Sequence, residues 1–216
     1  MAYDRPPMAI RPTTSLVSRE YYLPRLAPVF YQADAVVHWE MSVAHRRTGW
    51  LTPAFHYAFR EVMVHAGARY GLLCPVYCLM PDHIHLVWMG LRLDSDQRHA
   101  VAFLRTYVGP LLSPAELQHQ PYDHVLRDEE RRRNAFAATC GYILENPVEA
   151  GLVARRDGYP FSGAIVPGYP KWHPRDARFW PRFWALYAKS KDPAASMVKR
   201  PLDRTNAIRE ATPKSP

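Results

Sequence analysis

Two histidines and a tyrosine–asparagine pair are the residues of this sequence whose types and spacing indicate chemistry. His83 and His85 are separated by one residue, and Tyr142 precedes Asn146 by four. On a strand, side chains two residues apart point to the same side, so the histidines would present two imidazoles together. On a helix, residues four apart lie on the same face, about one turn from each other. The sequence therefore predicts a histidine pair and a tyrosine–amide pair on two different elements.

Together these pairs favour attack of a tyrosine hydroxyl on a phosphodiester. Neutral imidazoles bind Mn²⁺ or Zn²⁺, and Mg²⁺ where phosphate oxygens complete its coordination. The bound ion would stabilise the charge that develops at phosphorus, with Asn146 as a third protein ligand. Attack by Tyr142 would release a 3′-hydroxyl and leave a phosphotyrosine, which can be reversed onto another DNA end. Each pair also has a purely structural interpretation, as hydrogen-bonded strand histidines and as a boundary tyrosine with a helix C-cap.

The elements that must position these residues follow from apolar periodicity and turn residues. Thr52 and Pro53 have the residue types of a helix N-terminus, and Pro147 is expected to end the helix that carries Tyr142. Residues 113–123 and 158–170 are expected to form loops and turns. We expect strands at 35–44, 76–80 and 83–89, with a turn at Pro81–Asp82, and helices at 53–67, 96–112, 128–146 and 176–187.

This order of elements predicts an α+β fold with a small antiparallel sheet and helices packed on one face, a class in which the ferredoxin-like topology is one member. The expected organisation has four parts. It consists of an extended lead-in at 1–28, a catalytic domain at 29–170, a short aromatic helix at 171–188 and a basic tail without fixed structure at 189–216.

The net charge of +8 is concentrated at the C-terminal end. Residues 171–216 hold 11 of the 28 Lys and Arg but only 4 of the 20 Asp and Glu. Such a stretch either attracts phosphates or is a solvated tail. Its aromatic residues either stack on bases or pack the last helix onto the sheet, and we favour packing. Three cysteines without a pairing pattern, an N-terminus without an apolar signal core and no long apolar run predict a cytoplasmic protein without a membrane span.

Four stretches of the sequence resemble one family. Residues 76–88 read Val-Tyr-Cys-Leu-Met-Pro-Asp-His-Ile-His-Leu-Val-Trp, which is similar to the motif of HUH single-tyrosine transposases of the insertion-sequence type. Residues 122–127, Tyr-Asp-His-Val-Leu-Arg, and 142–153, Tyr-Ile-Leu-Glu-Asn-Pro-Val-Glu-Ala-Gly-Leu-Val, resemble the REP-associated tyrosine transposases within it. The Gly-Tyr-Pro-Phe-Ser segment at 158–162 matches that branch too.

The resemblance covers roughly residues 25–170 and has specific implications. It implies a divalent metal, Mg²⁺ or Mn²⁺, on His83 and His85, with Asn146 as the further ligand and Tyr142 as the nucleophile. It also implies single-stranded, hairpin-bearing DNA as the substrate. The chain departs from the family in having no tryptophan just before Tyr122 and few lysines between residues 88 and 112.

Other residues are candidates for supporting roles. The candidate second shell of the site is His124 with Asp123, for which a structural role in a loop is the alternative. Candidate contacts to the DNA backbone come from two arginine pairs. These are Arg131 and Arg132, for which pairing with the two neighbouring glutamates on the helix surface is the alternative, and Arg155 and Arg156, shortly after the tyrosine helix.

Two other functions are consistent with these residues. One is a domesticated protein that binds hairpin DNA without cutting it, and the other is a metal-dependent hydrolase of small phosphoesters. The protein is expected to act as a monomer or a homodimer.

Overall fold

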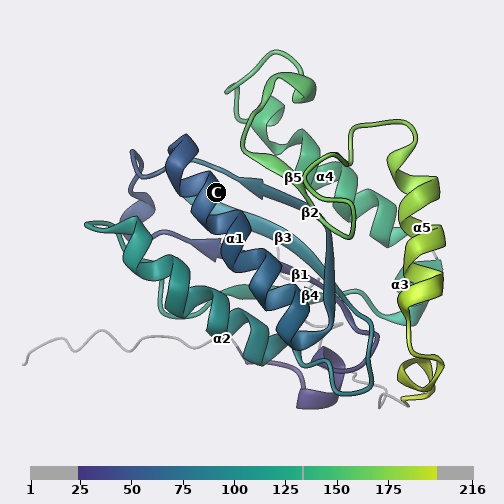
Figure 1. The fold of residues 1–216 in the computed structure, drawn as a ribbon. Coiled ribbons are helices and arrows are strands. Elements are labelled where there is room, and N and C mark those ends of the chain that lie inside the picture. The colour runs from purple at the N-terminus through teal and green to yellow at the C-terminus, as the bar shows by residue number, and fades with distance from the viewer. Residues whose placement is uncertain (1–23, 133, 199–216) are drawn as a thin grey trace, which may run out of the picture.

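The computed structural model describes residues 24–132 and 134–198, and its centre is a five-stranded antiparallel sheet (Figure 1). The strands lie in the order β4-β1-β3-β2-β5, and every neighbouring pair is antiparallel. Their bounds are β1 Val36–Ser42, β2 Leu72–Leu79, β3 His83–Gly90, β4 Tyr122–Val125 and β5 Ser162–Ile165. The α-helices are α1 Pro53–Tyr70, α2 Gln97–Val108, α3 Asp128–Arg132, α4 Ala135–Glu149 and α5 Phe179–Ser190. Short 3₁₀ turns are η1 Pro28–Tyr31, η2 Ala44–Arg46, η3 Gly109–Leu112, η4 Arg156–Gly158 and η5 Pro193–Met197.

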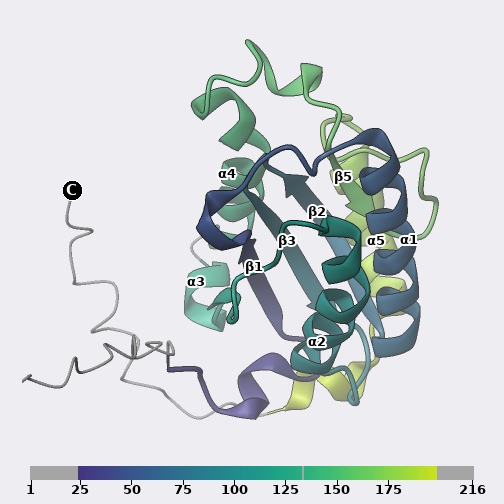
Figure 2. The same ribbon diagram turned by 90° about the vertical axis from the view of Figure 1, so that its left-hand side faces the viewer.

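The first four strands with α1 and α2 form the ferredoxin-like βαββαβ arrangement, which confirms the predicted α+β class. Helices α1 and α2 cover one face of the sheet, as expected. The structure adds a second helical layer, because α4 and α5 pack on the opposite face (Figure 2). Each face of the sheet therefore has its own apolar core, and α4 carries Tyr142 across the face on which the histidines lie.

Helix α1 begins at the predicted residues and ends later than predicted. The Thr52 side chain accepts a hydrogen bond from the Phe55 N–H, and Pro53 occupies the first turn. The helix continues past Gly67 and stops at Gly71, whose φ of 62° is the left-handed conformation favoured by glycine. Gly67 does not end it, because a glycine inside a helix lowers stability only modestly.

Strand β2 starts at Leu72, earlier than the predicted start at Val76. The pairing of β2 with β3 shifts register between Leu73 and Val76, on either side of Pro75. A bulge accommodates a residue without an N–H, so the proline does not interrupt the strand. The Pro81–Asp82 turn and β3 lie where they were predicted.

Strand β5 and the first half of β4 fall in segments that were expected to be loops and turns, and this expectation was wrong. Both are only four residues long and lie at the two edges of the sheet, β4 against β1 and β5 against β2. Such short segments carry too little alternation to be distinguished from loops before their pairing partners are known.

The predicted helix 128–146 is two helices, and Pro147 does not end the second. Asn134 has a φ of 63°, which separates α3 from α4. Helix α4 continues through Pro147 to Glu149. The proline removes one backbone hydrogen bond close to the C-terminus, where few bonds remain to be lost.

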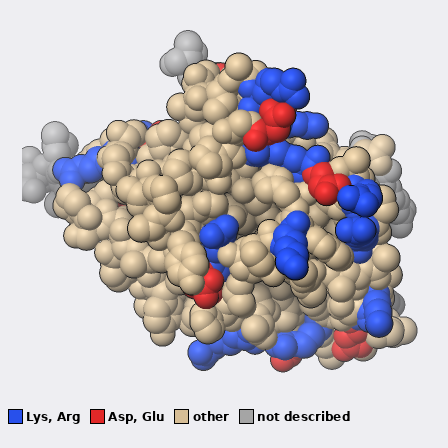
Figure 3. All heavy atoms as spheres, turned by 45° about the horizontal axis from the view of Figure 1, so that its top comes forward, with Lys and Arg blue, Asp and Glu red and all other residues tan. Residues whose placement is uncertain are grey.

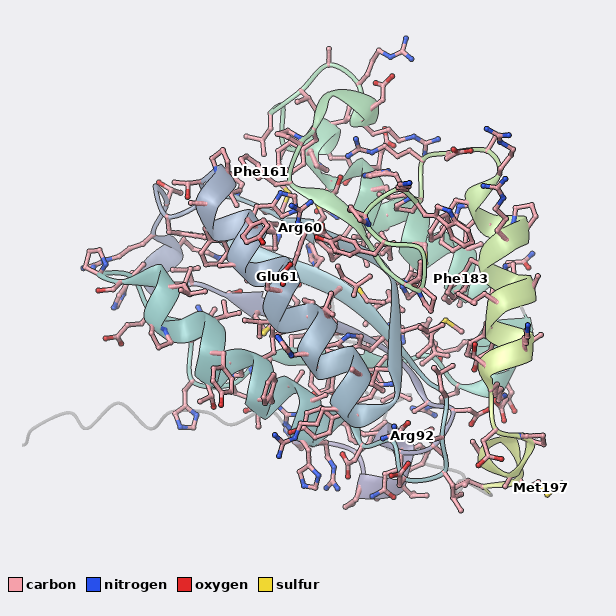
Figure 4. All side chains as sticks on the ribbon, viewed as in Figure 1. Arg60, Glu61, Arg92, Phe161, Phe183 and Met197 are labelled. Atoms are coloured by element: carbon pink, nitrogen blue, oxygen red, sulfur yellow. The ribbon has the colours of Figure 1, made fainter. Side chains whose placement is uncertain are left out.

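The core under α4 and α5 is rich in aromatic residues. Phe179 and Phe183 are 2% and 0% exposed, and Phe183 points from α5 toward the sheet (Figure 4). This confirms that the last helix packs onto the sheet through its aromatic side chains. The three cysteines are free and buried. Within the described ranges, no helix has the length and apolarity required to span a bilayer. Most of the predicted lead-in and most of the predicted basic tail lie outside the described residues.

Candidate functional site

The two histidines of β3 bring their ring nitrogens together at the start of the strand. His83 Nε2 lies 2.9 Å from His85 Nε2, and the two rings are perpendicular. The other ring nitrogen of His83, Nδ1, is hydrogen-bonded to Asp82 Oδ1 at 2.6 Å, in the turn before the strand. Both Nε2 atoms therefore converge on one point at the α4 face of the sheet.

The neighbouring strands place more polar groups beside this pair. In the register of the sheet, Glu40 lies opposite His85 on one side and opposite Tyr122 on the other. His38 lies opposite His124. His38 Nε2 is 3.1 Å from His85 Nδ1, so a third imidazole touches the pair from β1.

The histidine face is covered rather than open. His85 is 1% exposed and His38 is 7% exposed. Burial, with the neighbouring imidazoles, lowers the pKa of His85 to about 2, and burial beside His124 lowers the pKa of His38 to about 4. Both rings are therefore neutral at physiological pH, which is the form that binds metal ions.

Asp82 is the carboxylate nearest to the pair. Burial alone would raise its pKa, but the hydrogen bond with His83 and the charge of Arg46 hold the pKa below its usual value. Arg46 Nη1 lies 3.2 Å from Asp82 Oδ2. The ionised carboxylate accepts the Nδ1 proton of His83 and so leaves a lone pair on Nε2.

Helix α4 brings the tyrosine–amide pair to the same place. The Asn146 side chain is hydrogen-bonded to His85, and its Nδ2 donates to the Tyr142 carbonyl oxygen at 2.9 Å. Tyr142 is 47% exposed, with its ring 5.7 Å from that of His85 and 6.4 Å from that of His38, centroid to centroid. The four residues singled out in the sequence thus form one cluster, with three of them in hydrogen-bond contact and the phenol beside them.

The donor set fits a divalent cation. Two ligand atoms about 2.1 Å from an octahedral ion and cis to each other lie about 3.0 Å apart, close to the observed 2.9 Å between the imidazole nitrogens. An amide oxygen from Asn146 would be a third donor, which leaves positions for water or phosphate oxygens. Among the described residues, no group of three or more His, Cys, Asp or Glu side chains forms a metal-binding cluster.

An open groove runs along the exposed side of Tyr142. Its floor is formed by His38 and Glu40 of β1, and its walls by β4 and by Ala138 and Thr139 of α4. Tyr122, also 47% exposed, lies on the β4 side. The small residues next to Tyr142 leave its ring accessible to an extended ligand.

The two residues predicted to form a second shell lie on opposite faces of β4. His124 faces the groove, and its Nε2 is 3.0 Å from Glu130 Oε1. Asp123 points to the other face, where it accepts a hydrogen bond from the buried Tyr31 hydroxyl at 2.5 Å. The assignment of Asp123 to the second shell is therefore wrong. Once residues 122–125 form a strand rather than a loop, adjacent side chains must alternate between faces.

The structure describes the side chains of two of the four arginines predicted to contact DNA. The side chains of Arg131 and Arg132 lie outside the described part of the chain. The Arg155 side chain is 82% exposed and lies 3.1 Å from Asp157, and Arg156 lies 3.9 Å from Glu145 of α4. Figure 3 shows Lys and Arg side chains gathered over the segment after α4 and over α5, with a few Asp and Glu among them.

Sequence reasoning overlooked His38. A signal was present, since Val37, Trp39, Met41 and Val43 form the apolar side of β1 and leave His38 on the other side with Glu40. That alternation alone does not reveal the neighbour of His38. Only the register of β1 against β3 brings it to His85.

The fold is similar to that of a solved structure. The structure of a REP-associated tyrosine transposase bound to a REP hairpin superimposes on this chain with a TM-score of 0.55 at 17% sequence identity. The match covers 85% of this chain and 99% of that one. No protein-family model and no curated protein matches the sequence.

Proposed function

We propose that this protein is a metal-dependent enzyme that cleaves and rejoins single-stranded, hairpin-bearing DNA through a 5′-phosphotyrosine. The observation that carries the proposal is the cluster of His83, His85, Asn146 and Tyr142 in one place on the fold of a transposase. The transposase with the similar structure is itself bound to a hairpin. This arrangement of metal donors and phenol favours strand transfer over a purely structural role for the two histidines.

In this proposal the divalent ion, Mg²⁺ or Mn²⁺, supplies electrostatic stabilisation of the phosphoryl oxygens when it is bound. His83 and His85 would hold it through Nε2 and Asn146 through its amide oxygen. Asp82 keeps the proton of His83 on Nδ1, so that Nε2 remains a ligand atom.

Tyr142 acts as the nucleophile. Its phenolic oxygen forms a bond to phosphorus, the bond from phosphorus to the 3′-oxygen breaks, and the phenolic proton is lost while the 3′-oxygen gains one. The phosphotyrosine conserves the energy of the phosphodiester, so a second 3′-hydroxyl can reverse the step. An exposed ring over an open groove suits this role, because the same oxygen must meet two DNA ends in turn.

Arg155 and Arg156, in the segment after α4, would contact the DNA backbone, and Arg131 and Arg132 are proposed for the same role. The exposure of Arg155 supports this, since its ion-pair partner Asp157 is also on the surface. Such contacts strengthen binding without sequence preference and weaken as salt is added.

The proposal is tested by incubating the protein with a hairpin oligonucleotide that has single-stranded flanks and Mg²⁺ or Mn²⁺. A covalent protein–DNA adduct stable in denaturing gels is expected for the wild type and for Tyr107→Phe, which alters an exposed tyrosine of α2 on the other side of the sheet. Tyr142→Phe should form none. An adduct that persists in Tyr142→Phe would move the nucleophile to another residue, with Tyr122 the first to examine. Hairpin binding without any adduct under either ion would favour a non-cleaving binder, and phosphoester hydrolysis that survives Tyr142→Phe a hydrolase.

A further inference from the structure

His38 of β1 contacts the ring nitrogen of His85 that is not proposed to bind the metal. His38 Nε2 lies 3.1 Å from His85 Nδ1, with 5.2 Å between the ring centroids. Both rings are almost fully buried. A neutral imidazole has one N–H and one lone pair, so this contact requires one ring to donate and the other to accept. Which ring donates is set by the other nitrogen of His85.

In the hydrogen bond between Asp82 and His83, the donor and the acceptor are fixed. An ionised Asp82 can only accept, so His83 carries its proton on Nδ1 and a lone pair on Nε2. Without a cation, His83 Nε2 accepts from His85 Nε2–H at 2.9 Å. His85 Nδ1 then carries the lone pair, and His38 Nε2 donates to it.

Cation binding by both Nε2 atoms requires the opposite arrangement. His85 must free Nε2, so its proton must be on Nδ1, and His38 Nε2 must accept that proton in a hydrogen bond. The change is balanced: His85 gains a proton on Nδ1 from His38 and releases its Nε2 proton to solvent. His38 takes up a proton on Nδ1, so both rings stay neutral. Each ring thereby changes tautomer, and the 3.1 Å contact is kept in both states.

We infer that His38 is a positioning residue that holds His85 in the tautomer able to bind the cation. Glu40 is the other candidate acceptor, but its Oε2 is 3.9 Å from His85 Nδ1, beyond hydrogen-bond distance. His124, the cross-strand neighbour of His38, bonds to Glu130 instead. The inference rests on the proposed function, because it concerns the same pair of ligands. Residues that orient a metal-binding histidine in this way typically change metal affinity by about 10- to 100-fold.

The test compares two substitutions of His38 in the full chain. Glutamine has an acceptor oxygen that can take the place of Nε2, whereas leucine has none. We expect Mn²⁺ affinity, measured by titration in the presence of hairpin DNA, to fall by about 10- to 100-fold in His38→Leu and by only a few-fold in His38→Gln. His56→Leu is the matched control. It removes an equally buried histidine on the opposite face of the sheet and should leave Mn²⁺ affinity unchanged.

A second measurement reads the tautomer itself. Long-range ¹H–¹⁵N spectra of the histidine rings, with diamagnetic Zn²⁺ as the probe, should show the proton of His85 on Nε2 before addition and on Nδ1 after it. His38→Leu should impair this change and His38→Gln should retain it. Mn²⁺ affinity of His38→Leu equal to that of the wild type, or an unaltered tautomer change, overturns the inference alone. Absence of Mn²⁺ binding by the wild-type protein overturns the proposed metal site and the inference with it.

Discussion

The ring of Tyr142 meets the ring of His85 edge-on, with 69° between their planes. One belongs to α4 and the other to the central strand β3, and the core under α4 joins the two elements. Ile143 and Cys140 are 0% and 1% exposed in that core, on the side of the helix next to Tyr142. The position of the phenol is therefore set by ordinary apolar packing rather than by a loop, which gives a proposed nucleophile a defined place beside the imidazoles.

Replacement of Asn146 should separate its ligand role from a helix-capping role. Asn146→Leu is expected to weaken Mn²⁺ binding by about 10-fold or more, because a third donor is lost. Asn146→Asp keeps an oxygen at the same position and should retain binding. Glu149→Gln, an exposed change in the last turn of the same helix, is the control. Titration of the three variants with Mn²⁺ decides the matter: equal affinities for Asn146→Leu and wild type would exclude the amide from the site.

Asp123 should matter for stability and not for the site. It accepts the hydroxyl proton of Tyr31, which is 0% exposed, and lies 3.8 Å from Arg25. Asp123→Ala leaves that buried hydroxyl without its acceptor, so we expect the free energy of unfolding in urea to fall by about 1–3 kcal/mol. Mn²⁺ affinity should not change. A loss of affinity in a variant that remains folded would show that Asp123 acts on the site after all.

Two glycines should respond in opposite directions to alanine. A Cβ on Gly90 would lie 1.7 Å from the Ala33 carbonyl oxygen, a backbone atom that cannot move alone. Gly90→Ala is therefore expected to cost about 3 kcal/mol or more of unfolding free energy. A Cβ on Gly141, in the middle of α4, would meet nothing within 4 Å. Gly141→Ala should stabilise the protein by about 0.5–1 kcal/mol, because alanine is the better helix former. Thermal or urea unfolding of both variants tests the pair, and a neutral Gly90→Ala would contradict the close approach.

Stability should fall as the pH drops below the ordinary histidine pKa. His56 is hydrogen-bonded to the buried Tyr77 hydroxyl at 2.8 Å, and burial, with the charge of Arg60, lowers its pKa to about 4. Between pH 6.5 and 4 the unfolded chain takes up a proton that the folded His56 does not. The free energy of unfolding therefore decreases toward low pH, by at most about 1.4 kcal/mol per pH unit for one histidine. Above pH 6.5 His56 contributes no pH dependence.

The comparison of His56→Gln with wild type isolates this contribution from that of other buried histidines. Urea unfolding at pH 7 and at pH 4.5 should show a smaller difference in the variant than in the wild type. His65→Gln, an exposed change on the same helix, should keep the wild-type difference. If His56→Gln loses as much stability toward pH 4.5 as the wild type, His56 is not the residue responsible.

The sequence by itself determined the elements with long patterns and the identity of the candidate chemical groups. Thr52-Pro53 marked the start of α1, and the alternation around His83 and His85 identified β3 and the side on which its imidazoles lie. Both signals are local, because capping and side-chain alternation depend only on neighbouring residues. The order of elements then indicated an α+β fold with a small antiparallel sheet, a class that includes the ferredoxin-like arrangement of the structure.

Only the tertiary structure decided which distant residues meet. The pairing of β1 with β3 brings His38 to His85, and the strand geometry of β4 sends Asp123 to one face and His124 to the other. A shift of one residue in either register would move these side chains to the other face of the sheet and break the contacts. No local pattern specifies a register between strands far apart in the chain. The packing of α4 likewise sets the contact of Tyr142 with His85, since it depends on the shape of a core contributed by several elements.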